Sequence, residues 1–89
     1  MNITNFNWRD DVAIKLAAKH NVRTGEVEEA FANSPSYRKG RGGTYYLFGR
    51  TDAGRYVFVV FVYEGNGCAR PVTARDMTRP ERRLYDRSI

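Results

Sequence analysis

The longest uninterrupted run of apolar residues lies near the middle of the chain and predicts a central β-strand. In Arg55–Tyr63 only the first residue is polar, and the run is rich in the valine and aromatic residues that favour strands. A strand with one face in water would alternate apolar and polar positions. Here both sets of alternate positions are apolar, so we expect both faces to be covered, at least in part. Helices can cover one face, and a further helix, a cleft wall or a partner chain can cover the other.

Two shorter runs flank the central strand and predict its neighbours. Tyr45–Arg50 is aromatic and β-prone, and Thr51–Gly54 joins it to the central run as a short turn. On the other side, Gly65–Gly67 interrupts the chain before a third run, Cys68–Arg75. Short turn-forming connections between consecutive β-prone runs predict a three-stranded antiparallel meander over residues 44–75.

Apolar residues at helical spacing predict two helices before the meander. The first is expected over about residues 10–20, with Asp10 or Asp11 as its N-cap. The second is expected to begin with Thr24 as its N-cap and to end before Pro35, because the residue before a proline disfavours helix. Both helices are too short to be stable alone, so we expect them to pack on the sheet.

A capping-box pattern predicts a third helix after the meander. In Thr78–Glu81 a threonine precedes a glutamate by three positions, and Pro80 falls within the first turn. The elements together predict an α+β fold: a small antiparallel sheet with two N-terminal helices and one C-terminal helix. Residues 2–8 are expected to add an edge strand or an anchoring arm. The chain shows no repeat and no linker-like stretch, so residues 1–89 are expected to form a single domain.

The segment Ser36–Gly43 is basic and rich in glycine, and the sequence leaves its role open. After Tyr37 it carries three cations, Arg38, Lys39 and Arg41, and three glycines. We favour a loop that makes a secondary contact with RNA; a solvated hairpin loop, or a strand that pairs with the run that follows, is the alternative. Its glycines match no known phosphate-binding spacing.

Arginine dominates the positive charge, which indicates the class of partner. The formal net charge is +5, and 12 of the 15 basic residues are arginine. The planar guanidinium binds phosphate and carboxylate groups and stacks on bases and aromatic rings. Nucleic acid or an acidic protein partner is therefore expected. A GC-rich genome, whose codons favour arginine, is the alternative explanation.

Composition also limits the compartment and the cofactors that we expect. A single cysteine and a single histidine argue against an internal disulfide and against a zinc site. No signal peptide is evident, and the longest apolar run is too short to span a bilayer as a helix. We therefore expect a cytoplasmic protein without membrane segment, metal or cofactor.

Arg75, Glu81 and Tyr85 are the first candidates for a chemical site. Glu81 and Tyr85 share a helix face, and Arg75 ends the preceding strand, so the three can meet at the sheet–helix junction. A metal-free ribonuclease must activate a 2′-hydroxyl, stabilise charge on the phosphate and protonate the leaving oxygen. Arginine suits the second task, whereas Glu81, Tyr85, His20 and Lys19 are the available proton carriers. Structural roles compete with this reading: Glu81 completes a helix cap, Tyr85 can anchor the helix in the core, and His20 suits a helix C-terminus.

The chain resembles the BrnT family of toxins from Phe6 to Tyr85. The matching motifs, in order, are Phe6-x-Trp8 before Asp10-Asp11, Lys19-His20-x-Val22, Glu26–Phe31, Gly49-Arg50 with Arg55, the valine-rich strand, and Val72–Thr78 followed by Glu81-Arg82-Arg83-x-Tyr85. The closing block from Thr73 to Tyr85 is the most specific. Arg9 and Asn21 depart from the commonest residues at their positions, and the varied first helix weakens the transfer of any catalytic role to it.

This resemblance implies a RelE-like fold and the toxin of a type II toxin–antitoxin pair. Such toxins are metal-free endoribonucleases that inhibit translation by cleaving mRNA, free or on the ribosome, and a DNA-binding antitoxin neutralises them. The resemblance carries the catalytic roles to Arg75, Glu81 and Tyr85, with Lys19 and His20 in support. The cations that we expect to contact RNA are Arg50, Arg55, Arg70, Arg79, Arg82, Arg83, Lys39 and Arg41.

Two other functions remain open from the sequence. The chain could be a non-catalytic, toxin-like module that holds a protein partner through its apolar sheet and basic helix. The partner could be an antitoxin or a second copy of the chain, since either would cover the second apolar face of the central strand. Sequence-specific DNA binding by the chain alone is disfavoured, because no helix-turn-helix pair precedes the last helix.

Overall fold

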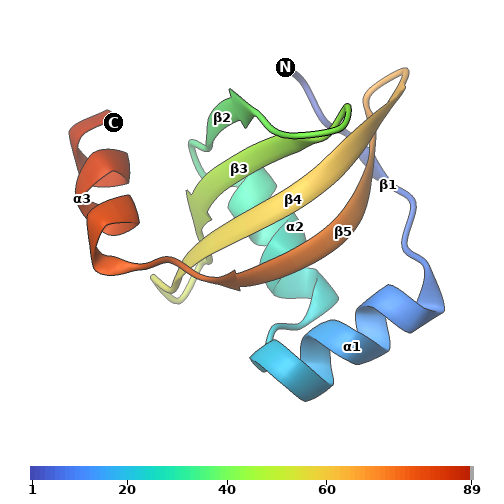
Figure 1. Cartoon of the computed structure of the whole chain (residues 1–89), viewed down its shortest axis with the longest axis horizontal. Helices are drawn as coiled ribbons and strands as arrows, with labels where there is room; N and C mark the ends of the chain where they lie inside the picture. Colours follow the sequence, from blue (N-terminus) through green and yellow to red (C-terminus); the bar gives the residue numbers. More distant parts are fainter. Residues whose placement is uncertain (89) are drawn as a thin grey trace.

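A computed structural model describes residues 1–88 and contains three helices and a five-stranded sheet (Figure 1). In chain order the elements are β1 (Asn5–Phe6), α1 (Asp10–His20), α2 (Thr24–Ala32), β2 (Ser36–Lys39), β3 (Tyr45–Arg50), β4 (Tyr56–Gly65), β5 (Cys68–Asp76) and α3 (Arg79–Ser88).

The sheet has the strand order β1-β5-β4-β3-β2. The predicted meander is confirmed as β3, β4 and β5, which pair antiparallel, and the predicted N-terminal edge strand is confirmed as β1, which runs parallel to β5. The sheet is larger than predicted, because Ser36–Lys39 pairs with β3 as a fifth strand. That pairing lets Tyr37 pack against Phe31 and Phe61 in the core, which a solvated loop would not do.

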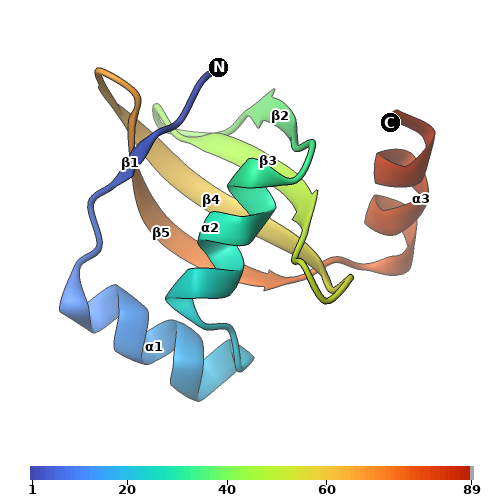
Figure 2. The ribbon, with the colours of Figure 1, turned by 180° about the vertical axis from the view of Figure 1, so that it is seen from behind.

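Helices α1 and α2 cover one face of the sheet and enclose the main core (Figures 1 and 2). We call this side the closed face. The ring of Phe61 on β4 is fully buried, and it meets the ring of Phe31 on α2 edge-on at 5.0 Å between centroids. Leu16 of α1 and Val27 of α2 are also fully buried there. Because both helices are short, their stability depends on packing against the sheet.

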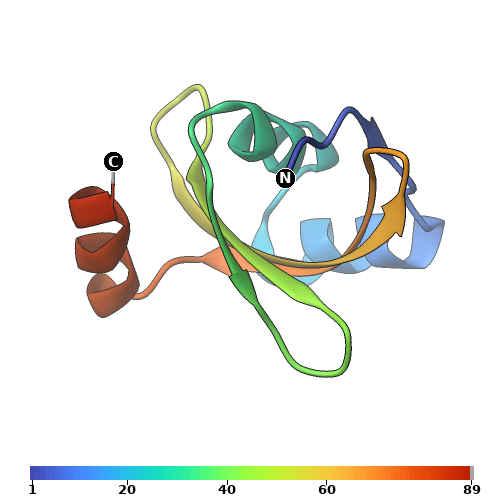
Figure 3. The same ribbon diagram turned by 90° about the horizontal axis from the view of Figure 1, so that it is seen from above.

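The opposite side of the sheet, which we call the open face, is covered only at one end. Helix α3 stands beside the sheet there, away from α1 and α2 (Figure 3). A smaller buried cluster of Phe58, Met77 and Tyr85 joins α3 to β4 and to the end of β5. Val60 and Val62 of β4 are only partly buried. The prediction that both faces of β4 are covered at least in part is confirmed, and the covering of this face is incomplete.

The predicted caps of the first two helices are wrong by one or two residues. Both α1 and α2 have an arginine at the N-cap, Arg9 and Arg23, and neither arginine caps with its side chain. Asp10 and Thr24 are instead the first helical residues. In α2 the N-cap residue is bound by an acidic side chain inside the helix: the Glu26 carboxylate accepts the Arg23 backbone N–H at 3.0 Å.

The predicted cap of α3 is confirmed. The carboxylate of Glu81 accepts the backbone N–H of Thr78 at 2.8 Å, and the backbone N–H of Glu81 donates to the Thr78 hydroxyl at 3.4 Å. This reciprocal pair fixes the direction in which α3 leaves the sheet. Across residues 1–88, no helix combines the length and apolar character needed to cross a membrane.

Candidate functional site

Strand register aligns a row of side chains across the open face. Arg75 on β5 stands opposite Phe58 on β4, Phe58 stands opposite Phe48 on β3, and Phe48 stands opposite Ser36 on β2. Side chains at paired positions point to the same face of a sheet. We call this set the Arg75 row; it places a cation at one end and aromatic rings in the middle.

A second row runs beside the first and ends in another arginine. Its members, in strand order from β2 to β5, are Arg38, Tyr46, Val60 and Thr73. Arg38 is exposed, whereas Tyr46 and Val60 are partly buried. The two rows together form an aromatic surface with arginines at diagonally opposite ends. Base rings stack on aromatic surfaces and arginine binds phosphate, so this pattern suits single-stranded nucleic acid.

Arg75 forms a bidentate ion pair with Glu81, and both residues were among the first candidates from the sequence. Its Nη1 and Nη2 donate to the two carboxylate oxygens at 2.8 and 3.0 Å, and Nη1 also donates to the main-chain oxygen of Asp76 at 3.0 Å. The guanidinium carbon lies 4.3 Å from the centroid of the Phe58 ring. The charged group is therefore held in place by three different elements while 38% of its side-chain surface stays exposed.

One edge of the Arg75 guanidinium is left without a partner among the described residues. The Glu81 carboxylate occupies the Nη1–Nη2 edge, whereas no hydrogen bond is formed by Nε. The N–H groups of Nε and Nη2 are parallel and can bind two oxygens of one phosphate. The ion pair thus orients Arg75 and leaves the Nε–Nη2 edge available for a phosphate.

Glu81 is ionised at neutral pH and retains some acceptor capacity. The hydrogen bond from Arg75 is the main cause that lowers its pKa, and burial opposes the shift. Oxygen Oε1 accepts from Thr78 and Arg75, while Oε2 accepts from Arg75 alone. A carboxylate oxygen has two lone pairs, so Oε2 can accept one more proton donor.

Tyr85 lies on the same side of α3 but serves first as an anchor. It is 3% exposed, and its hydroxyl donates to the main-chain oxygen of Ser34 at 3.2 Å. Burial raises the pKa of the phenol, which is therefore neutral at physiological pH. Its ring meets the Tyr56 ring edge-on at 6.0 Å. The hydroxyl links α3 to the loop that follows α2.

A pocket of about 240 Å³ opens between α3 and the β2–β3 edge of the sheet. It is lined by Ser36, Arg38, Phe48, Glu81, Leu84 and Tyr85. Most of its wall is apolar, with the polar side chains at its sides. The pocket brings Glu81 and Tyr85 together with Arg38, a residue that the sequence placed only in the basic segment Ser36–Gly43.

Arg50 and Arg82 both lie over the ring of Tyr56, at 4.5 and 4.3 Å from its centroid. Arg50 also donates to the main-chain oxygen of Gly54 at 3.3 Å, and the Tyr56 hydroxyl donates to Asp86 at 2.9 Å. Among residues 1–88 neither arginine forms an ion pair with a carboxylate. Both remain candidates for contact with phosphate.

His20 and Lys19 do not join the Arg75–Glu81 pair. Both lie at the end of α1, which packs on β5. Lys19 is exposed, and within residues 1–88 the imidazole of His20 forms no hydrogen bond. It is the main-chain oxygen of His20 that the structure uses, as an acceptor for Arg55 at 3.1 Å. A catalytic role for either residue stays a prediction.

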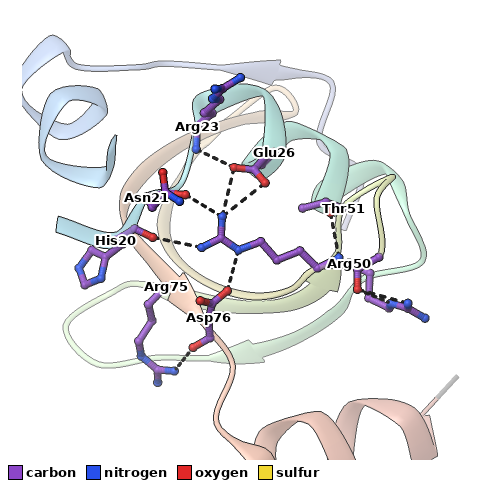
Figure 4. Close-up of polar contacts among 10 residues, drawn as sticks. His20, Asn21, Arg23, Glu26, Arg50, Thr51, Arg75 and Asp76 are labelled. Carbon is purple, nitrogen blue, oxygen red and sulfur yellow. Dashed lines mark hydrogen bonds and ion pairs between the residues drawn. The ribbon is translucent and has the colours of Figure 1, made fainter. Parts of the chain in front are cut away.

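Arg55 is partly buried at the junction of both helices with the sheet, where its side chain is 24% exposed. Figure 4 shows His20, Asn21, Glu26 and Asp76 around a single guanidinium. Arg55 donates to the main-chain oxygen of Asn21 at 2.7 Å and to the carboxylate of Asp76 at 2.6 Å, and it pairs with Glu26 at 3.3 Å. We call this set the Arg55 network. It satisfies carbonyls at the end of α1, which otherwise lack donors.

The remaining residues that were predicted to contact RNA differ in exposure and in whether their charge is paired within the protein. Arg70 is paired with Glu64 at 3.0 Å, at the far end of the sheet from α3. Arg79 and Arg83 are exposed on α3, and Lys39 and Arg41 are exposed at the β2–β3 hairpin. Tyr46 and Phe48 were missed by sequence reasoning, and Arg38 was considered only as one cation of the basic segment Ser36–Gly43. The signal that could have found them is the strand register, which depends on β2 being a strand.

No metal site is evident among the described residues, since no group of three histidine, cysteine, aspartate or glutamate side chains could hold an ion. The charged groups that are paired on the open face are the guanidinium of Arg75 and the carboxylate of Glu81.

Comparison with solved structures identifies a similar protein, the ribonuclease toxin BrnT of Brucella abortus, whose crystal structure was determined at 1.1 Å. The alignment covers 85% of this chain and 100% of that chain, with a TM-score of 0.71 and 15% sequence identity. No protein-family model matches the sequence, and no curated relative matches it significantly. The resemblance to BrnT is therefore confirmed at the level of the fold.

Proposed function

We propose that this protein is the toxin of a type II toxin–antitoxin pair and that it cleaves RNA without a metal ion. The observation that carries the proposal is the Arg75–Glu81 pair, held on an aromatic face that is open to solvent. The fold, shared with a ribonuclease toxin, supports the same conclusion. The protein would act in the cytoplasm on mRNA, free or on the ribosome.

The proposed reaction is attack of a ribose 2′-oxygen on the adjacent phosphorus. A bond forms between the 2′-oxygen and phosphorus, the bond from phosphorus to the 5′-oxygen breaks, and a 2′,3′-cyclic phosphate and a 5′-hydroxyl result. Arg75 would bind the phosphate through its free Nε–Nη2 edge and stabilise the charge that grows on the phosphate oxygens. No proton needs to leave the guanidinium for this role.

Glu81 and Tyr85 are the proposed proton carriers. Glu81 would accept the 2′-hydroxyl proton on Oε2, the oxygen with remaining acceptor capacity. Tyr85 would donate a proton to the leaving 5′-oxygen, since its phenol is neutral at physiological pH. The tyrosine would recover the proton from solvent, and Glu81 would release its own, so that both return to their starting states.

A DNA-binding antitoxin is the proposed partner, and it would cover the open face. Tyr46, Phe48 and Val60 on this face are only partly buried, and the cation Arg38 lies exposed beside them. An antitoxin that presents acidic side chains over this face would shield both the aromatic surface and Arg75.

Growth arrest and RNA cleavage test the proposal together. The native chain and Arg75→Ala are induced in cells, and total RNA is compared on a gel; the purified proteins are then incubated with RNA in the presence of EDTA. We expect the native chain to arrest growth and cleave RNA in EDTA, and the variant to cleave about 10²–10³-fold more slowly, as for the loss of one donor to a developing oxyanion. Full cleavage by Arg75→Ala would remove Arg75 from the mechanism.

The same experiment separates the alternative, a toxin-like module without catalysis. The partly uncovered apolar face favours such a module, because it suits a protein partner whether or not RNA is cleaved. Intact RNA with the folded native chain, together with tight binding of an antitoxin, would support the alternative.

A further inference from the structure

The pocket beside the Arg75–Glu81 pair is built for a flat ring with polar edges. Its apolar wall includes the ring of Phe48 and the side chain of Leu84, and Leu84 is 51% exposed although it is a large apolar residue. Its volume of about 240 Å³ lies below the roughly 300–1,000 Å³ of pockets that hold drug-sized ligands. Space of this size suits one ring system with an apolar face.

The position of the pocket fits a nucleotide whose phosphate lies at Arg75. Phe48, on the pocket wall, belongs to the Arg75 row and is separated from Arg75 by one strand, β4. Neighbouring strands lie about 4.8 Å apart, so the two positions are about 10 Å apart across the sheet. A nucleotide spans such a distance between its phosphate and the outer edge of its base.

The polar groups at the pocket indicate which base would be preferred. Arg38 reaches the pocket from β2, and among residues 1–88 its guanidinium forms no ion pair and no hydrogen bond, so its side-chain donors are free. Two parallel N–H donors of a guanidinium match the O6 and N7 acceptors of guanine. Adenine presents a donor next to N7, which would face the guanidinium donors, and pyrimidines offer no N7 acceptor.

We infer that Ser36, Arg38, Phe48 and Leu84 form a base-recognition site that selects guanine next to the scissile phosphate. This inference rests on the proposed function and adds its sequence preference. Arg38 reads the O6 and N7 edge of the base, while Phe48 and Leu84 contact its ring. Ser36 supplies a hydroxyl at the β2 side of the pocket. Arg38 acts here as a specificity residue and takes no part in proton transfer.

Binding to strands that cannot react tests the site without relying on cleavage. Short uridine-rich strands with deoxyribose at every position lack the attacking hydroxyl; each carries guanine, adenine, cytosine or 7-deazaguanine at one place. Their affinities for the native chain are measured by fluorescence anisotropy. We expect the guanine strand to bind at least about fivefold more tightly than the other three, the lower end of the discrimination from one bidentate arginine.

Two variants of neighbouring residues separate recognition from charge. Arg38→Ala should bind all four strands with similar affinity, and 7-deazaguanine should cost it nothing further. Lys39→Ala removes the same charge from the adjacent residue, whose side chain points to the other face of β2. It should weaken all four strands equally and keep the preference for guanine.

The outcomes distinguish this inference from the function on which it rests. Tight binding of all four strands with equal affinity would overturn guanine selection and leave the ribonuclease proposal standing. A guanine preference that survives Arg38→Ala would overturn the role of Arg38. Failure of the folded native chain to bind any of the four strands would overturn this site, whereas failure of the native chain to cleave RNA would overturn the proposed function.

Discussion

The two faces of the sheet each hold an arginine bound to carboxylate and main-chain oxygens, and the two arginines differ in how many of their donors remain free. On the closed face, Arg55 directs all of its donor nitrogens to carbonyls or carboxylates of α1, α2 and β5, and 24% of its side-chain surface is exposed. On the open face, Arg75 has one carboxylate partner, an unpaired edge and an exposure of 38%.

This difference separates a structural arginine from a candidate catalytic one. Arg55 joins α1, α2 and β5, so its loss removes the donor that the main-chain oxygens of His20 and Asn21 and the carboxylate of Asp76 share, and breaks the ion pair with Glu26. Arg75 is oriented by Glu81 and Phe58, yet little of the fold depends on it. The first arginine should matter for stability and the second for chemistry.

Substitution of the two arginines is the strongest way to break this comparison. Arg55→Ala should lower the free energy of unfolding by about 3 kcal/mol, because it leaves partly buried acceptors and charges unpaired. Arg75→Ala removes one ion pair whose arginine side chain is 38% exposed, and should cost about 0.2–1 kcal/mol. Urea unfolding followed by circular dichroism measures both values. Equal losses for the two variants would contradict the distinction.

The tightness of the closed face can be tested through glycine. A Cβ added at Gly49 on β3 would lie 2.8 Å from the main-chain oxygen of Ala30 and 3.3 Å from its Cβ. Gly49→Ala should therefore destabilise the fold by about 1–3 kcal/mol, the usual cost of overpacking. The matched control is Gly25→Ala in α2, where a Cβ meets nothing within 4 Å. That change should be neutral or stabilise the helix by up to about 1 kcal/mol; a similar loss in both variants would argue against close packing of β3 on α2.

The pH dependence of stability tests the ion pair on the open face. Arg75 lowers the pKa of Glu81 below its ordinary value of 4.5, so the pair contributes fully above pH 4.5 and is lost as the pH falls through the lower, folded-state pKa. Glu81→Gln should be less stable than the native chain at pH 7, by about 0.2–1 kcal/mol for an exposed pair.

The difference between the native chain and Glu81→Gln should shrink below pH 4.5, because the native carboxylate is then protonated as well. Thermal unfolding at a series of pH values measures it. Asp10→Asn is the matched control, since Asp10 is exposed at the start of α1. If the stability difference between the native chain and Glu81→Gln stayed constant down to strongly acid pH, the charge of Glu81 would not contribute to stability.

Local patterns in the sequence were sufficient for most of the fold. The three central strands follow from uninterrupted β-prone runs and tight turns, and the start of α3 follows from the Thr78–Glu81 capping box. The N-caps of the first two helices were placed one or two residues too late, at Asp10 or Asp11 and at Thr24. A residue that favours the N-cap also suits the first turn of a helix, so the two positions are hard to tell apart from sequence. These features depend on neighbours in sequence, which is why they could be predicted.

The site was only partly predictable, because its geometry depends on residues that are far apart in the chain. Arg75 and Glu81 are six positions apart and bridged by a recognisable cap, so their pairing was within reach of sequence reasoning. Arg38 reaches the pocket only because β2 pairs with β3 in a particular register. Arg55 was assigned to RNA binding, since a sequence reveals charge but does not show which partners a charge will find in the fold.

Arg75 and Asp76 are consecutive residues of β5 and serve opposite faces of the sheet, one in the candidate site and the other in the Arg55 network. Their order ties two separate functions to the alternation of one strand. A one-residue insertion or deletion in this part of β5 would turn each side chain to the wrong face, and both functions would fail at once. Over evolution, length changes in related chains should therefore accumulate in the β2–β3 hairpin and the chain ends, while the end of β5 keeps its length.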